Sequence, residues 1–212
     1  MCGRYSDHIE KMNGWNSSFK KWPDVRHSYN IAPTSTVTAF RTTTGEPMRW
    51  GLIPSWAESF ESTYSTFNAR IETVNEKPTF RDAWKNSQRC LIPMAGYYEW
   101  KGEKGNKQPY YVTDRFTGGL VAAGLYDSWK LGKFLSCTIL TKPADEAMSN
   151  LHSRIPILLT PESALDWMNC SDDLNQDVVE RIIRPKLSFY QVGKVVGNSE
   201  VDNSHLIEPR RL

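Results

Sequence analysis

Short strand-like runs, rich in β-branched and aromatic residues and bounded by turn residues, recur along most of this chain and constrain its fold more than any other feature. Runs of this length and composition predict strands. Because they far outnumber the helical patterns, they favour a domain built on sheet. The predicted strands cover Thr36–Arg41, Met48–Ile53, Thr66–Ile71, Arg89–Trp100, Pro109–Thr113, Leu120–Tyr126, Phe134–Thr141, Ile155–Leu159 and Ser188–Val196.

Three segments instead show the period of amphipathic helices. The second of them begins at Thr160-Pro161, where an N-cap residue precedes a first-turn proline. No repeat, low-complexity segment or linker divides the chain. We therefore expect one α+β domain over residues 1–212, with an antiparallel, barrel-like β-sheet core and peripheral helices. The apolar helical positions are Phe80, Ala83 and Trp84, then Leu165 and Met168, then Leu174, Val178 and Ile182.

Composition excludes several functional classes. The net charge of +2 is too small to predict nucleic-acid binding by itself, so any basic surface has to be a local patch. No apolar run approaches the length of a membrane span, and we expect no membrane partner. The four histidines show no metal-ligand spacing, so we expect neither a metal nor a cofactor. The four cysteines form no CxxC pair, and we expect no disulfide framework, which suits a reducing cytoplasm. Cys90 and Cys137 are expected in the core.

Cys2 directly follows the initiator methionine. Because cysteine is small, we expect methionine aminopeptidase to remove Met1, which would leave an α-amine and a thiol on the same residue. Such a 1,2-aminothiol condenses with an aldehyde to a Schiff base, on which the thiolate closes to give a thiazolidine. It can equally act as an N-terminal nucleophile in acyl transfer. Taken by itself, a cysteine at position 2 has a simpler interpretation, as a residue without special function that merely follows the initiator methionine. The rest of the chain must therefore decide between these two interpretations.

Polar side chains interrupt otherwise apolar strand patterns at three places. Asn68 and Arg70 lie two residues apart and therefore share one face of a strand. Glu99 lies among aromatic residues, an environment typical of a general acid. His152 and Arg154 are again two residues apart, before a run that reads as a buried strand. Histidine is the natural proton shuttle near neutral pH, so these places are candidates for acid–base chemistry.

A fourth stretch ends in Pro-Ser-Trp, a turn that would carry Trp56 at its tip. Each of these features has a simpler alternative interpretation. Asn68 could be a turn residue and Glu99 a solvated carboxylate at the end of a strand. His152 could be a structural histidine and Trp56 a core aromatic, while the arginines could belong to an ordinary solvated surface. Taken singly, none of these signals is specific.

Together with Cys2, however, these stretches resemble one family, the SOS response-associated peptidases (SRAP). The similar segments follow one another in the family's order across nearly the whole chain. One departure lies after Pro54, where some bacterial members carry two adjacent tryptophans and this chain has Trp56 followed by Ala57-Glu58. The similar segments are Met1–Arg4, Tyr29–Pro33, Met48–Trp56, Phe67–Thr73, Gly96–Trp100, Gln108–Tyr111 and Leu151–Pro156.

The resemblance implies a function in the DNA-damage response. Members of this family cross-link covalently to abasic sites in single-stranded DNA through the N-terminal cysteine, forming a thiazolidine. It implies that Glu99 supplies acid–base function for opening the sugar ring, that His152 assists proton transfer and that Asn68 orients the α-amine. With Cys2 these are the expected catalytic residues. The residues expected to bind DNA are Arg4, Arg49, Arg70 and Arg154, under phosphates, and Trp56, stacked on a base.

Two other functions stay open at this point. The same centre could belong to an N-terminal-nucleophile cysteine peptidase, which could also remove its own Met1 and so prepare the DNA reaction. Alternatively, the chain could be a non-catalytic module for single-stranded DNA in which Cys2 has no role. The partner that the resemblance implies is single-stranded DNA with abasic sites, and we expect a monomer to bind it.

Overall fold

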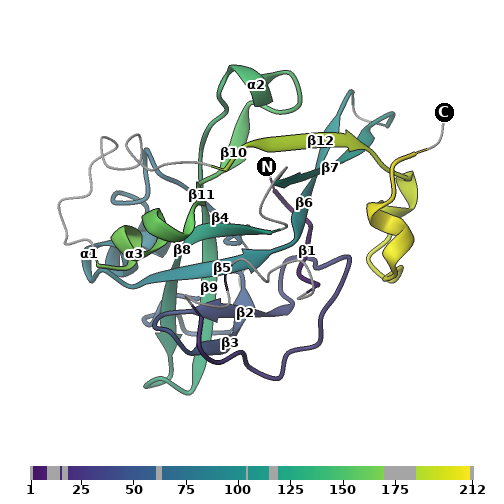
Figure 1. The fold of residues 1–212 in the computed structure, drawn as a ribbon. Helices are drawn as coiled ribbons and strands as arrows, with labels where there is room; N and C mark the ends of the chain where they lie inside the picture. The colour runs from purple at the N-terminus through teal and green to yellow at the C-terminus, as the bar shows by residue number, and fades with distance from the viewer. Residues whose placement is uncertain are drawn as a thin grey trace.

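A closed barrel of five strands forms the centre of the protein (Figure 1). The computed structural model describes residues 2–8, 15, 19–60, 64–103, 105–114, 119–169 and 185–210. Around the barrel each strand pairs with the next, and β9 closes the ring by pairing with both β8 and β3. All of these pairings are antiparallel except β3 with β9. In order around the ring the strands are β3 (Gly45–Trp50), β2 (Thr36–Phe40), β5 (Arg89–Met94), β8 (Leu120–Trp129) and β9 (Phe134–Pro143).

A second, antiparallel sheet of four strands adjoins the barrel. Its order is β1 (Tyr5–Ser6), β6 (Gly96–Lys101), β7 (Gln108–Asp114) and β12 (Leu187–Gln191). The chain passes from β5 of the barrel to β6 of this sheet at Ala95, whose N–H donates to the carbonyl of Ser6. The second sheet therefore carries the N-terminal segment next to the barrel.

Gly96, the first residue of β6, shows why this passage needs a glycine. A Cβ at this position would lie 2.4 Å from the Tyr111 ring and 2.6 Å from the Val112 carbonyl oxygen. Real Cβ atoms essentially never come so close, so any other residue would push β7 away from β6. The glycine thus keeps the two strands close where β6 begins.

The C-terminal half of β9 extends beyond the barrel and is flanked by two short strands. On one edge β4 (Asn68–Arg70) runs parallel to it, and on the other edge β10 (Arg154–Pro156) runs antiparallel. Thr141 is paired with Arg70 on the first edge and with Pro156 on the second. This arrangement brings segments from distant parts of the chain to the two sides of one strand.

Helices are short and lie at the periphery (Figure 1). Helix α1 buries Phe80, Ala83 and Trp84, as its spacing predicts. Helix α3 starts at Pro161, as predicted, but buries Ala164 and Trp167, whereas Leu165 is 57% exposed. The described helices are α1 (Pro78–Lys85), α2 (Glu146–Ser149) and α3 (Pro161–Asn169), with 3-10 turns at η3 (Lys194–Gly197) and η4 (Ser204–Ile207).

Leu165 therefore lies on the outward face of α3. The indole N–H of Trp167 donates to the Cys90 carbonyl at 3.2 Å, and this large side chain turns its own face of α3 toward the core. The expected last helix, with Leu174, Val178 and Ile182, lies outside the described residues.

The predicted α+β class with a barrel-like sheet is confirmed, with differences at three strands. The expected run Arg89–Trp100 forms two strands, β5 and β6, in different sheets. The run Ile155–Leu159 is divided into β10 and β11 (Leu158–Leu159), which pair with β9 and β8. The last run is a strand only to Gln191. Cys90 and Cys137 are fully buried, as expected.

Candidate active site

Cys2 lies at the centre of the candidate site, fully buried in the core cluster of the barrel. Its thiol lies 3.8 Å from the Arg4 carbonyl oxygen, and its own carbonyl accepts a hydrogen bond of 2.7 Å from the Asn68 side chain. Burial raises the pKa of the Cys2 thiol well above its ordinary value, and the nearby Glu99 carboxylate raises it further. The thiol is therefore held in its neutral form at neutral pH.

Asn68 is the first residue of β4, so it is a strand residue and not a turn residue. Its position follows from the parallel register in which Asn68 pairs with Ile139 of β9. Nδ2 donates to the Cys2 carbonyl, while Oδ1 is buried and accepts no hydrogen bond within the part of the chain that the structure describes. One side of the amide thus holds Cys2 in place, and the other offers a buried acceptor.

Glu99 lies within β6 and is only 4% exposed, which excludes the interpretation as a solvated carboxylate. The backbone N–H of Trp100 donates to its Oε1 at 3.2 Å. His152 Nε2 lies 3.9 Å from the same oxygen. The carboxylate and the imidazole therefore face each other at a distance that a small rotation converts into a hydrogen bond.

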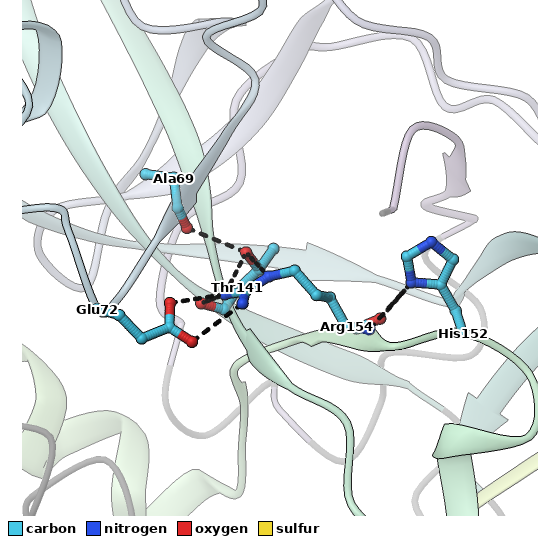
Figure 2. A network of polar contacts seen from close by, with 5 residues as sticks. All are labelled: Ala69, Glu72, Thr141, His152 and Arg154. Carbon is cyan, nitrogen blue, oxygen red and sulfur yellow. Dashed lines mark hydrogen bonds and ion pairs between the residues drawn. The ribbon is translucent and has the colours of Figure 1, made fainter.

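His152 lies two residues before Arg154, the start of β10, and keeps 28% of its side chain exposed. The backbone N–H of Arg154 donates to Nδ1 at 3.0 Å, and the carbonyl oxygen of Arg154 lies 3.1 Å from the same nitrogen (Figure 2). In the neutral ring Nδ1 accepts from the N–H, which leaves the proton on Nε2. In the imidazolium Nδ1 donates to the carbonyl. Nδ1 has a partner in both protonation states, as a proton shuttle requires.

Tyr97 was not anticipated from the sequence as part of the site. It shares a face of β6 with Glu99, two residues away, and is 1% exposed. Its hydroxyl is buried without a hydrogen-bond partner among the described residues. Burial raises the pKa of Tyr97, and the nearby Glu99 carboxylate raises it further, so the hydroxyl stays neutral beside this centre. The spacing from Glu99 was the available signal.

Two of the expected binding residues lie on the surface. Trp56 is 57% exposed in the turn after β3, which excludes a core role. Arg70 is exposed at the end of β4, two residues from Asn68. Both side chains can therefore meet a large partner without rearrangement of the fold.

The other expected arginines have partners within the protein. Arg4 donates to Asn30 Oδ1 at 2.9 Å, and Arg49 donates to the Gly51 carbonyl at 2.6 Å while its guanidinium lies 5.5 Å from the Phe60 ring centre. Both are partly buried. The guanidinium of Arg154, only 14% of whose side chain is exposed, is bound by Glu72 and Thr141 (Figure 2). Neither Glu72 nor Thr141 is among the site residues predicted from the sequence.

Comparison with known proteins places this arrangement in a family. A family model described as SOS response associated peptidase (SRAP) matches residues 1–199. The chain belongs to the SRAP family. It is 32% identical to a SRAP relative, the abasic site processing protein YoqW of Bacillus subtilis, over 98% of this chain and 99% of that protein. Mouse HMCES, also named an abasic site processing protein, is 29% identical over 78% of this chain and 57% of its own length.

A solved structure shows the same architecture. The crystal structure of a protein from Bacteroides thetaiotaomicron matches with a TM-score of 0.81 and 23% identity, over 99% of this chain and 100% of that one. At this identity the likeness concerns the fold alone. Within the described ranges no helix is long and apolar enough to cross a membrane. Nor does any group of three or more His, Cys, Asp or Glu side chains there form a possible metal site.

Proposed function

We propose that this protein processes abasic sites in DNA by binding the single strand as a monomer and cross-linking to the lesion through Cys2. The relatives' names support abasic sites as the target. The observation that carries the proposal is one centre in which Asn68 holds the buried Cys2, and Glu99, whose carboxylate raises the pKa of the Cys2 thiol, faces His152. The reaction requires that Met1 has been removed, so that the α-amine of Cys2 is free.

The chemistry begins with the sugar. An abasic deoxyribose is a cyclic hemiacetal, and opening its ring needs a proton for the ring oxygen and a base for the hydroxyl. Glu99 and His152 face each other and can supply this pair of functions. The α-amine then adds to the aldehyde carbon, and loss of water gives the imine. The thiol adds to the same carbon while its proton moves to the nitrogen, which closes the thiazolidine ring.

The electrostatics favour this order of events. A fully buried thiol with a raised pKa is a poor nucleophile until a base takes its proton. The amine therefore attacks first, and the thiol follows once the imine lies beside it. The Glu99 carboxylate raises the pKa of the thiol, and we assign it the role of that base. Asn68 Oδ1 supplies the acceptor for the α-amine or for a sugar hydroxyl.

The exposed residues supply DNA affinity. Trp56 would stack on a base beside the lesion, a contact that tolerates any sequence. Arg70 would bind a phosphate next to Asn68, and Arg4 and Arg49 would contribute positive charge from their partly buried positions. The missing base itself is what the site recognises, because a baseless sugar is the least costly to extrude.

A denaturing gel tests the proposal directly. The protein is incubated with a single-stranded oligonucleotide that carries one abasic site, with an undamaged oligonucleotide and with an abasic analogue that lacks the aldehyde. We expect a denaturant-stable adduct only with the true abasic site. A native shift without any covalent adduct would favour the DNA-binding module. Absence of both would favour the peptidase. Intact mass of the purified protein shows whether Met1 has been removed.

A further inference from the structure

Asn68 and His152 reach the site from opposite edges of one strand. Asn68 begins β4, which pairs with one edge of β9, and His152 precedes β10, which pairs with the other edge. Each flanking strand is only three residues long. Three-residue strands form few ladder hydrogen bonds, so pairing alone defines their positions only weakly. The spacing between Asn68 and His152 therefore depends on what else joins β4 to β10.

An ion pair spans β9 at this place (Figure 2). Glu72 follows β4, and Arg154 begins β10. The guanidinium binds the carboxylate in bidentate fashion, with Nη1 donating to Oε1 at 3.0 Å and Nη2 to Oε2 at 2.9 Å. Bidentate pairs fix orientation as well as distance. The two flanking strands are thereby tied to each other as well as to β9.

Thr141 of β9 connects this ion pair to the backbone of β4 (Figure 2). It is fully buried. Its hydroxyl donates to the Ala69 carbonyl at 3.2 Å and lies 3.3 Å from Arg154 Nε and Nη2, which donate to it. Its carbonyl accepts from Arg154 Nη2 at 2.8 Å and from the Ile71 N–H at 3.0 Å. One residue thus fixes the Arg154 side chain against the residues that surround Asn68.

We propose that Glu72 and Arg154 form a clamp across β9 that sets the positions of Asn68 and His152. Glu72 and Arg154 are thereby positioning residues for the cross-linking reaction. The inference rests on the proposed function for its consequence and on Figure 2 for its geometry. Arg154 acts on His152 through its own backbone, because its N–H and carbonyl are the partners of Nδ1. Glu72 holds the Arg154 side chain and acts through it.

The clamp is ionised under ordinary conditions. Burial acts to raise the pKa of the Glu72 carboxyl, but the hydrogen bonds and charge of Arg154 outweigh this, and the pKa is lowered overall. The Glu72 side chain is therefore ionised throughout and above the pH range in which an ordinary glutamate titrates. The ion pair is lost only when the pH falls below that range. Arg154 is engaged by these contacts, so we assign it a positioning role, and its predicted phosphate contact stays a prediction.

Glu72→Gln tests the clamp because it removes the charge and keeps the shape. At saturating protein, the rate of adduct formation should fall roughly 10- to 100-fold, the cost of a misplaced catalytic group. Affinity for undamaged single-stranded DNA should stay unchanged. The matched control is Glu46→Gln, which breaks the bidentate Arg41–Glu46 pair of 2.6 and 2.7 Å elsewhere in the barrel. That variant should cross-link at the parent rate.

The nitrogen chemical shifts of the His152 ring give a readout that does not require cross-linking. In the parent, the neutral form of the ring should carry its proton on Nε2, because the Arg154 N–H donates to Nδ1, and in Glu72→Gln the neutral form should be a mixture of tautomers. If Glu72→Gln folds poorly, Arg154→Lys replaces it as the test variant. It keeps the charge but cannot bind in bidentate fashion, so it should show the same mixture of tautomers. Because these spectra do not require cross-linking, they test the clamp even if the parent forms no adduct. A parent that forms no adduct would refute the proposed function separately.

Three results would overturn the inference. The first is a parent-like cross-linking rate together with a parent-like His152 ring spectrum in Glu72→Gln. The second is an equal loss of rate in Glu46→Gln, which would show only a general loss of stability. The third is a loss of DNA affinity with an unchanged rate, which would return Arg154 to the phosphate-binding role that the sequence suggested.

Discussion

The centre around Cys2 and the surface around Trp56 and Arg70 differ most in their exposure to water. Cys2 and Glu99 are 0% and 4% exposed, whereas Trp56 is 57% exposed. Removal from water suits the chemical steps, because it holds the thiol neutral and strengthens every interaction with the carboxylate. Exposure suits contact with a long polymer that must find the protein first. Rate and affinity should therefore be separable by mutation.

Cys2→Ala should have the largest effect and affect only the buried centre. Without the thiol the imine cannot close to a thiazolidine, so the heat-stable adduct should disappear. A weaker Schiff base through the α-amine should persist and be trapped by borohydride. Denaturing gels with and without borohydride measure both species. A heat-stable adduct in Cys2→Ala without borohydride would remove the thiol from the mechanism.

Glu99→Gln should come next. It keeps the fold and the DNA affinity but removes the acid–base group, so adduct formation should slow by about 10²–10⁴-fold. A time course on one abasic oligonucleotide compares the variant with the parent. Glu103→Gln, an exposed carboxylate in the loop after β6, is the matched control and should behave as the parent. Equal rates for all three proteins would make Glu99 a structural residue and leave His152 as the proton shuttle.

Trp56→Ala should have the opposite pattern. Loss of one stacked base weakens single-strand affinity by about 1–3 kcal/mol, while the rate at saturating protein should stay at the parent value. Fluorescence titration with an undamaged oligonucleotide measures the affinity. Leu165→Ala removes another exposed apolar side chain, on α3, and should change neither quantity. If Trp56→Ala lowered the saturated rate and left affinity intact, the division between centre and surface would fail.

The smallest effect concerns the buried region alone and appears at alkaline pH. Burial raises the pKa of the Cys2, Cys90, Tyr5 and Tyr97 side chains, and that of Cys137 to about 12. The folded protein therefore retains protons that the unfolded chain loses between about pH 8.5 and 10. The free energy of unfolding should fall as pH rises through this range.

Urea denaturation at a series of pH values measures this slope. Cys90→Ala removes one buried thiol, so its unfolding free energy should fall less steeply with pH than that of the parent. A flat profile in the parent would contradict the assignment of these groups as desolvated.

The local structure and the kinds of chemistry can be predicted from the sequence alone. Period and composition predict the strands of the barrel and the buried face of α1, because a strand or helix side chain points where its spacing directs it. The residue types at Cys2, Asn68, Glu99 and His152 are those that aldehyde chemistry needs, and their order along the chain was sufficient to indicate the SRAP family.

Which of these groups meet, and what holds them together, depends on the tertiary structure. Glu72 and Arg154 are 82 residues apart, and nothing local predicts their pairing, which depends on β4 and β10 lying on opposite edges of β9. The run from Arg89 to Trp100 likewise divides between two sheets at Ala95, whose N–H donates to Ser6, far away in the chain. Long-range pairing depends on the whole set of competing partners, whereas periodicity records only each segment's own preference.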